Sequence, residues 1–258
     1  MRRALLAAAI LCASCAHHAA GTVATSTPSP SASAPPTAAP TIAPTPRATQ
    51  APVAATPRPA AGIAVPGAGS STQAIVVRTP SWNATVGTLE VFEKDSGAWK
   101  VVVPPVTAHV GYNGFAQDKR EGDGRTPAGV YGLSLAFGTD ADPGTHLTYR
   151  RATQNDVWVD DPSSSLYNTW QTAPANGRWR SAEQLYQPAP YAYAAAVAYN
   201  TARTPGRGSA IFLHISLGHA TSGCVSIDES ALLRVLRWLD PVRRPVIVMG
   251  PSSYVDSL

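Results

Sequence analysis

The chain has 258 residues, a formal net charge of +4 at pH 7 and 24 prolines, 11 of which lie between Pro28 and Pro66. The part after these prolines is long enough for one domain with a sizeable core. The basic residues are mostly arginines scattered among acids, and this pattern argues against a nucleic-acid-binding protein. The sequence has no glycine-rich phosphate loop and no zinc-type cluster of His and Cys, so we expect no cofactor and no metal.

Residues 1–16 have the pattern of an export signal. Two arginines give a charged start, and residues 4–11 form an apolar stretch that is much shorter than the ~20 residues of a membrane-spanning helix. Small residues precede Cys15, as at a bacterial lipoprotein cleavage site, although Cys12 stands where such sites usually have leucine. We predict a signal peptide of the lipoprotein type, with Cys15 as the lipid anchor that tethers the chain to the outer face of a membrane. Ordinary cleavage followed by secretion is the alternative, and both place the mature chain outside the cytoplasm, in the cell envelope.

Residues 17–72 form a low-complexity stretch of alanine, proline, threonine and serine. Only Arg47 and Arg58 carry charge within it, and no apolar periodicity appears. Such a composition cannot bury enough apolar surface to offset the entropy lost on ordering, and proline favours extended geometry. We therefore predict a disordered, semi-rigid linker; an inert or O-glycosylated tail is the alternative reading.

From residue 73 onward the pattern changes to that of β-strands. Short apolar runs are separated by turn residues, and Asp95-Ser96-Gly97 is typical of a hairpin. Pro104-Pro105 cannot donate backbone hydrogen bonds, so we expect an edge or a bend at that point. The predicted strands cover residues 74–77, 86–94, 99–103, 106–110, 130–137, 157–159, 191–199 and 246–249.

One clear helix is predicted near the C-terminus. Asp228 is a good N-cap, and Glu229 follows it in the first turn. A stripe of leucine and valine side chains continues to Leu239, and Asp240-Pro241 ends the pattern. The sequence therefore predicts one mainly β domain over residues 73–251, with one or a few helices.

The stretch of residues 211–227 carries the candidate chemistry. An apolar run at its start predicts a buried strand that ends at His214, and Cys224 is the only cysteine outside the first fifteen residues. A lone cysteine near a histidine in an exported chain is a candidate nucleophile, because an imidazole can generate the reactive thiolate. Backbone N–H groups around Ser222, Gly223 and Cys224 could face a developing oxyanion. The alternative is a structural thiol, although an unpaired thiol is a liability in an oxidising compartment.

This stretch resembles the active-site signature of L,D-transpeptidases with a YkuD-type catalytic domain, in which a histidine and a short loop precede Ser/Thr-x-Gly-Cys. Here the signature reads His214 and then Thr221-Ser222-Gly223-Cys224-Val225. The chain departs from many members, which have His at the position of Ser222, and only ten positions separate His214 from Cys224. The resemblance covers residues 75–250. Three further blocks within it are similar to that family: residues 111–114, residues 119–129, and Asp160-Asp161-Pro162 with Tyr167-Asn168.

The resemblance implies a β-sandwich-like domain that forms peptidoglycan cross-links in the cell wall. Cys224 would attack an L–D bond of a peptidoglycan stem peptide, form a thioester and release D-alanine, and an amine of a neighbouring stem would accept the acyl group. His214 would act as general base and acid. Ser216 or a backbone carbonyl would orient His214, and His219 is the alternative base.

The resemblance also places Tyr167 and Asn168 in the substrate cleft, and it makes Cys224 a target of carbapenem-type β-lactams. Two other functions stay open. An L,D-carboxypeptidase or another thiol hydrolase would use the same nucleophile with water as the acceptor. A non-catalytic wall-binding module would keep the groove without needing the thiol, and the intact pair of His214 and Cys224 argues against it.

Overall fold

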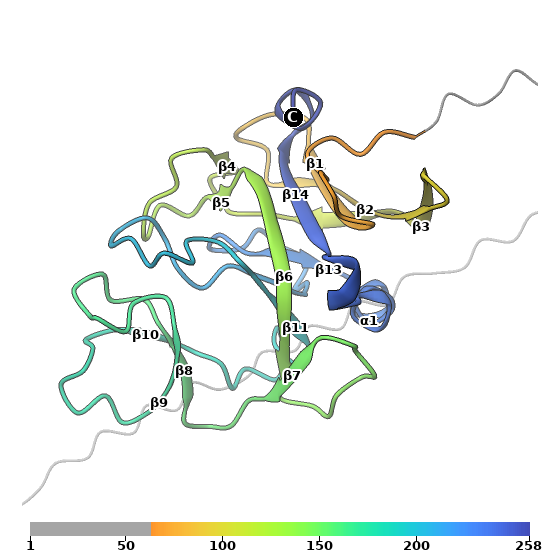
Figure 1. Cartoon of the computed structure of the whole chain (residues 1–258). Coiled ribbons are helices and arrows are strands. Elements are labelled where there is room, and N and C mark those ends of the chain that lie inside the picture. The colour runs from red at the N-terminus through yellow and green to blue at the C-terminus, as the bar shows by residue number, and fades with distance from the viewer. Residues whose placement is uncertain (1–62) are drawn as a thin grey trace, which may run out of the picture. The chain divides into compact units, whose positions relative to one another are not determined.

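The computed structural model describes residues 63–258, which Figure 1 shows coloured along the chain. The predicted signal peptide, the lipid anchor at Cys15 and the predicted linker up to residue 62 lie outside the described residues. The described part is mainly β-strand with two α-helices, so the predicted fold class is confirmed. No helix within residues 63–258 is both long enough and apolar enough to cross a membrane.

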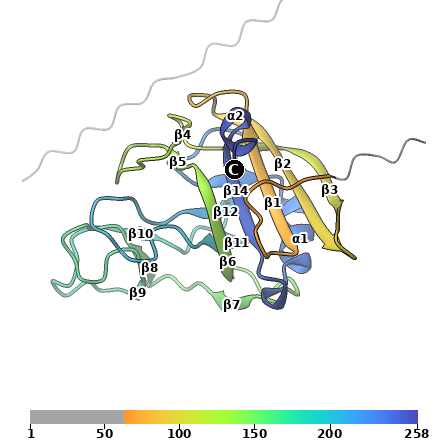
Figure 2. The same cartoon turned by 45° about the horizontal axis from the view of Figure 1, so that its top comes forward.

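Nine strands form one sheet that curls round and closes on itself. The strand order is β11-β12-β13-β3-β2-β1-β14-β6-β7, and an additional pairing of β11 with β6 joins the first strand to the eighth. Closure wraps the strands around a common interior, as Figures 1 and 2 show from two sides. The strands are β1 (Gln73–Thr79), β2 (Val86–Asp95), β3 (Ala98–His109), β6 (Gly129–Gly138), β7 (Thr148–Arg151), β11 (Ala194–Val197), β12 (Phe212–Ile215), β13 (Val225–Ile227) and β14 (Val246–Pro251).

The interior of this closed sheet holds the main hydrophobic core. Neighbouring residues of a strand point to opposite faces, so each strand sends alternate apolar side chains inward. Helix α1 (Glu229–Trp238) packs its apolar stripe against β3 and β12 and joins the same core. Full burial stabilises each large aliphatic side chain by about 1.5–3 kcal/mol. Fully buried members include Ile75, Val77, Leu89, Val91, Leu213, Ile227, Leu232, Val235, Leu236 and Ile247.

The two ends of α1 follow the predicted signals. The Asp228 carboxylate accepts hydrogen bonds from the backbone N–H groups of Ser230 (2.9 Å) and Ala231 (3.3 Å), as an N-cap does. After the helix, Asp240 caps the 3₁₀ turn η1 (Pro241–Arg243), because proline cannot continue the α-helical hydrogen bonds. A second helix, α2 (Ser252–Val255), follows β14 directly and was not predicted.

Each predicted strand overlaps an observed strand. The hairpin between β2 and β3 turns at Ser96 and Gly97, whose φ angles of 49° and 87° are the left-handed values of a tight hairpin turn. Pro104-Pro105 does not end β3; the register with β2 instead shifts nearby, between Leu89 and Val91. The predicted irregularity is therefore present as a bulge within one long strand.

Two small sheets were not recognised as such in the sequence, because their strands are too short for a clear alternation. One pairs β4 (Phe115–Ala116) with β5 (Thr126–Pro127). The other has the order β10-β8-β9, with β8 (Asp156–Val159) between β9 (Trp170–Thr172) and β10 (Ala182–Gln184). Only β8 overlaps a predicted strand. The second sheet matters for function, because it carries one wall of the candidate site.

The folded part extends beyond both predicted boundaries. Ile63 forms a bridge with Trp99, and Val65 and Ala68 are buried in a second apolar cluster on the outer face of β1 and β14. Part of the stretch assigned to the linker, between residues 63 and 72, therefore contacts the domain. At the other end, Val255 is buried in the same cluster, beyond the predicted end at residue 251.

Candidate active site

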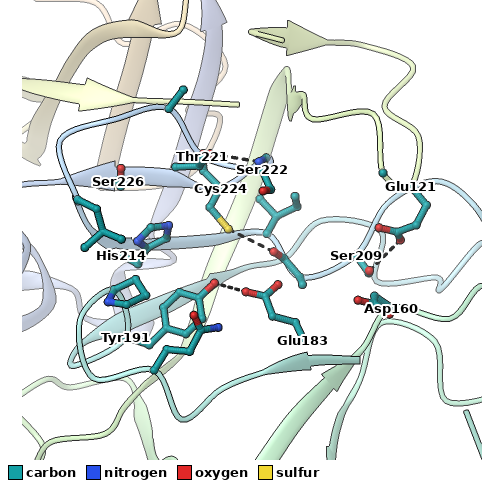
Figure 3. A pocket seen from close by; sticks show the side chains of 18 of the residues that line it. Glu121, Asp160, Glu183, Tyr191, Ser209, His214, Thr221, Ser222, Cys224 and Ser226 are labelled. Carbon is teal, nitrogen blue, oxygen red and sulfur yellow. Dashed lines mark hydrogen bonds between the residues drawn. The ribbon is translucent and has the colours of Figure 1, made fainter. Parts of the chain in front are cut away.

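A cavity of about 360 Å³ opens beside β12 and β13 and contains both Cys224 and His214 (Figure 3). Three parts of the chain line it. The first is the loop of residues 119–122 after β4, and the second runs from Asp160 through β10 to Tyr191. The third covers residues 209–226, which include the end of β12 and the loop into β13. The cavity therefore lies between the closed sheet and the small sheet that contains β10.

The parallel pairing of β12 with β13 brings the predicted nucleophile and base to one face. In this pairing Leu213 lies opposite Val225, and His214 lies opposite Ser226. Because side chains alternate along a strand, His214 shares its face with Ser226, and the position two residues before Ser226 is Cys224. Figure 3 shows the His214 ring beside the Cys224 side chain.

The Cys224 thiol is buried, with only 7 % of the residue exposed. It donates to the carbonyl oxygen of Ala210 (Sγ–O 3.3 Å) and accepts from the backbone N–H of Phe212 (3.4 Å). Burial, and next the negative charge of Glu183, raise the pKa of this thiol well above its usual range. The resting cysteine is therefore a protonated thiol at neutral pH.

His214 is held in the tautomer that a general base needs. Its Nδ1 lies 2.8 Å from the carbonyl oxygen of Ile215, and because a carbonyl only accepts, Nδ1 carries the proton and Nε2 keeps its lone pair. Burial lowers the pKa of the imidazole to about 4, so the ring is neutral at pH 7. The ring of Tyr191 packs edge-on against it, with 5.2 Å between ring centroids.

The backbone around Cys224 is fixed by two threonines, the buried Thr126 and the half-buried Thr221. Thr221 Oγ1 donates to the Cys224 carbonyl oxygen at 2.7 Å, and Thr126 Oγ1 donates to the same oxygen at 3.2 Å. Gly223 has a φ of 145°, and a Cβ atom there would lie 3.0 Å from the carbonyl oxygen of Arg125. Glycine is therefore required by backbone conformation and close packing together.

The predicted oxyanion donors lie at the cavity, but not all of them are free to donate a hydrogen bond. Ser222 and Gly223 both line the cavity beside Cys224. The Gly223 N–H already donates to Thr221 Oγ1 at 3.1 Å. In the resting geometry this N–H is therefore engaged, and an oxyanion would have to draw it away from Thr221.

Ser216 does not orient His214, which corrects that prediction. Its hydroxyl lies 3.0 Å from Nδ1 of His109, and it also accepts from the N–H of Gly218. The orienting group is the other predicted alternative, a backbone carbonyl, supplied by Ile215. His219 lines the cavity on an exposed loop, and its Nδ1 bonds to the Ala220 carbonyl oxygen.

Tyr167 and Asn168 lie behind the cavity wall and not in it, which corrects their predicted place in the cleft. Tyr167 is 1 % exposed, and its hydroxyl donates to Glu121 and accepts from the N–H of Gly208. The Asn168 side-chain oxygen accepts from Ala210, whose own carbonyl receives the Cys224 thiol proton. Both residues therefore support the wall from behind.

Sequence reasoning missed the polar side chains that face Cys224 across the cavity. Glu121 and Asp160 stand in blocks that carry the family resemblance, but nothing in their spacing indicated a shared wall. Glu183 on β10 accepts a hydrogen bond from the hydroxyl of Tyr191. Burial, with repulsion from Asp160 and Glu121, raises the pKa of Glu183 to about 7 despite the bond from Tyr191. These residues come from distant parts of the chain, so only the folded structure brings them together.

Residues 63–258 contain no cluster of side chains arranged to bind a metal ion. No group of three or more His, Cys, Asp or Glu side chains in this part of the chain is placed to hold a metal ion. The three cavity carboxylates are spread along the wall in Figure 3 and do not converge on a point. What the arrangement offers is a thiol nucleophile, a neutral imidazole base and an acidic wall.

Comparisons with known proteins point to one family. A sequence model described as L,D-transpeptidase catalytic domain (YkuD) matches residues 73–248. Among solved structures, the helical cell shape determining protein Pgp2 from Campylobacter jejuni is 15 % identical, with a TM-score of 0.38, and the match covers 71 % of this chain and 49 % of that one. Bd1075 from Bdellovibrio bacteriovorus is 16 % identical, with a TM-score of 0.37 and coverage of 72 % and 52 %. The chain thus spans about half the length of each structure. No curated protein matches it.

Proposed function

Because the chain belongs to the L,D-transpeptidase catalytic domain (YkuD) family, we propose that it is a cysteine acyltransferase that cross-links peptidoglycan stem peptides. The observation that carries this proposal is the placement of Cys224 and His214 on one face of β12 and β13, inside one cavity. A thiol beside a neutral imidazole is a nucleophile with its own base. Membership of the family accounts for the peptidoglycan substrate class.

In the acylation step, the Cys224 sulfur attacks the carbonyl carbon on the L side of an L–D peptide bond. The thiol proton passes to Nε2 of His214, whose lone pair is free because Nδ1 is bonded to the Ile215 carbonyl. The tetrahedral intermediate collapses as the C–N bond breaks, and His214 returns the proton to the departing amine of D-alanine. A thioester on Cys224 remains.

In the second step, an amine of a neighbouring stem peptide attacks the thioester carbonyl. His214 accepts the amine proton and returns it to the Cys224 sulfur as the C–S bond breaks. The product is a cross-linked dimer, and the enzyme regains its thiol. With water in place of the amine, the same step releases a shortened stem and corresponds to a carboxypeptidase.

The proposed reaction belongs outside the cytoplasm, where the peptidoglycan substrate of this family lies. We place the chain in the cell envelope, either anchored through lipid on Cys15 or secreted. Carbapenem-type β-lactams present a strained carbonyl to the same thiol. They are therefore expected to acylate Cys224 and to leave a covalent mass adduct on it.

Product analysis with a disaccharide-tetrapeptide tests the proposal. The full chain and its Cys224→Ala variant are incubated with the substrate, and free D-alanine and dimeric muropeptide are measured by mass spectrometry. Release of D-alanine together with dimer, both dependent on Cys224, is the expected result. Release of D-alanine without dimer would assign the carboxypeptidase reaction instead. Equal results for wild type and variant would contradict both enzymatic functions.

A further inference from the structure

Ser226 is a buried polar residue whose side chain makes no hydrogen bond. The residue is 1 % exposed, and within residues 63–258 its Oγ is one of two buried side-chain atoms that lack a hydrogen-bond partner. Burial of an unbonded hydroxyl costs free energy, and an alanine in this place would avoid that cost. Stability therefore does not explain the hydroxyl, which calls for a partner in another state of the protein.

The strand pairing places Ser226 between two histidines. On one side β13 pairs with β12, where Ser226 lies opposite His214, and on the other side β13 pairs with β3, where Ser226 lies opposite His109. Residues that lie opposite each other share one face of the sheet, on strands about 5 Å apart. Ser226 also lines the catalytic cavity, and Figure 3 shows it on the same side of Cys224 as His214. Rotation of χ1 can therefore carry its oxygen toward either ring without movement of the backbone.

Of the two rings, His214 is the one that lacks a second partner. The ring of His109 is half-buried, and its Nδ1 lies 3.0 Å from the hydroxyl of Ser216. His214 is 7 % exposed, and its Nδ1 is bonded to the carbonyl oxygen of Ile215. Its Nε2 takes part in no hydrogen bond within the described part of the chain. Nε2 is also the atom that receives the thiol proton in the proposed mechanism.

The need for a partner arises when the His214 ring becomes charged. An imidazolium carries an N–H group on both nitrogens, and a buried charge is costly unless it is hydrogen-bonded. The titratable side chains on the elements around the ring are Tyr191, Cys224, His219, His109 and Glu183. Only Glu183 among these is a carboxylate, and it is bonded to the hydroxyl of Tyr191. The neutral oxygen of Ser226 is thus an available acceptor for the charged ring.

We propose that Ser226 is a positioning residue that accepts a hydrogen bond from Nε2–H of His214 once this ring has taken the proton of Cys224. This inference rests on the proposed function and adds a residue to its proton transfers. In acylation the S–H bond breaks and an N–H bond forms at Nε2. That N–H donates to Ser226 Oγ until the proton passes to the departing amine. While the proton is held there, the sulfur keeps the electron pair with which it attacks the carbonyl carbon.

The same bond serves the second step. Nε2 takes a proton from the acceptor amine, donates it in a hydrogen bond to Ser226 Oγ, and returns it to the sulfur as the C–S bond breaks. Because Ser226 is almost fully buried, it acts through His214 and not on the substrate. Its loss should therefore lower kcat and leave KM unchanged.

Titration of the imidazole rings tests the inference without any substrate. The full chain and its Ser226→Ala and Ser226→Thr variants are titrated from pH 7 to pH 3, and the ring C–H signals are followed by NMR. The His214 signal is the one missing from His214→Gln. A hydrogen bond to the charged form raises a pKa, so Ser226→Ala should protonate His214 about one pH unit lower than wild type does. Ser226→Thr keeps the hydroxyl and should restore most of this difference.

Ser216→Ala is the matched control for the titration. It removes a hydroxyl that lies two residues from His214 but bonds to His109, so the midpoint of His214 should stay within about 0.3 pH unit of wild type. The same small change in Ser226→Ala would overturn the inference. A shift of His109 in place of His214 would also overturn it, because Ser226 would then serve the other ring. Circular dichroism confirms that the compared variants are folded.

A substrate arm separates failure of this inference from failure of the proposed function. With a disaccharide-tetrapeptide, kcat of Ser226→Ala should fall about tenfold while KM stays within about twofold of wild type. An unchanged kcat, or a lower kcat without a shift of the His214 midpoint, overturns the role of Ser226 and leaves the acyltransferase standing. If even wild type does not react while the His214 midpoint still shifts, the contact between Ser226 and His214 stands and the peptidoglycan function fails.

Discussion

Replacement of Glu183 by glutamine should stabilise the protein, and only at neutral or higher pH. The folded-state pKa of Glu183 is raised to about 7, from an ordinary value of 4.5, chiefly by burial and then by repulsion from Asp160 and Glu121. The folded state therefore binds this proton more tightly than the unfolded state does. The stabilisation that comes from the bound proton is present below about pH 4.5 and is lost as the pH rises to about 7.

The magnitude follows from the size of the shift. A shift of about 2.5 pKa units corresponds to about 3 kcal/mol, and partial solvent exposure of Glu183 reduces the expected effect to about 2 kcal/mol. Glutamine keeps an oxygen that can accept the Tyr191 hydrogen bond but never ionises. Glu183→Gln should therefore unfold like wild type at pH 4 and should be more stable by about 2 kcal/mol at pH 8.

Urea denaturation at both pH values, followed by tryptophan fluorescence, measures this difference. Asp118→Asn serves as a control for the removal of an exposed carboxylate and should show no pH-dependent gain. Equal stability of Glu183→Gln and wild type at pH 8 would refute the argument. So would a gain of the same size at pH 4, since the carboxyl is then uncharged in the folded wild type.

Three further predictions follow from single contacts. Because the resting Cys224 is a buried neutral thiol, its alkylation rate by iodoacetamide should rise about tenfold per pH unit from pH 6 to 9; a plateau near neutral pH would indicate a resting thiolate–imidazolium pair instead. Ser226→Ala removes a buried hydroxyl without a partner, so thermal unfolding should show no loss of stability, and a clear loss would reveal a bond that the structure lacks. Asp228→Ala removes the N-cap of α1 and should lower the free energy of unfolding by about 1 kcal/mol in urea titrations. An unchanged free energy of unfolding would show that this cap does not stabilise the fold.

The sequence predicted the sheet strands and the main helix because their signals are local. Alternation and turn residues mark β1, β2 and β3, and Asp228 with the apolar stripe marks α1. The placement of Cys224 near His214 follows from two adjacent parallel strands, and periodicity alone cannot supply that strand pairing. Closure of the sheet through β11 and β6 is a long-range pairing without any local signal.

The errors in the predicted site have a common physical cause. Tyr167 and Asn168 were assigned to the cleft by likeness, whereas their hydrogen bonds turn them toward Glu121 and Ala210 behind the wall. Ser216 is two residues from His214, yet its hydroxyl bonds to His109 on β3. Which of several nearby groups a polar side chain contacts depends on neighbouring strands, and a single sequence does not encode that choice locally.

The acidic wall was the largest omission. Glu121 lies in a loop, Asp160 directly follows β8 and Glu183 lies on β10, and these three residues line one cavity only in the folded chain. A carboxylate in a polar stretch is usually a solvated surface group, so no local pattern indicates that these three residues belong together. Their lack of cationic partners is visible only in the folded chain.

The central claim is that Cys224 forms a covalent acyl-enzyme with a stem peptide. Intact-protein mass spectrometry of the full chain, quenched in acid shortly after mixing with a disaccharide-tetrapeptide, tests it most directly. We expect an added mass equal to that of the substrate minus that of free D-alanine, located on the peptide that contains Cys224 and absent from Cys224→Ser. Cys224-dependent turnover with no such adduct at any quench time, or an adduct on another residue, would contradict the proposed mechanism.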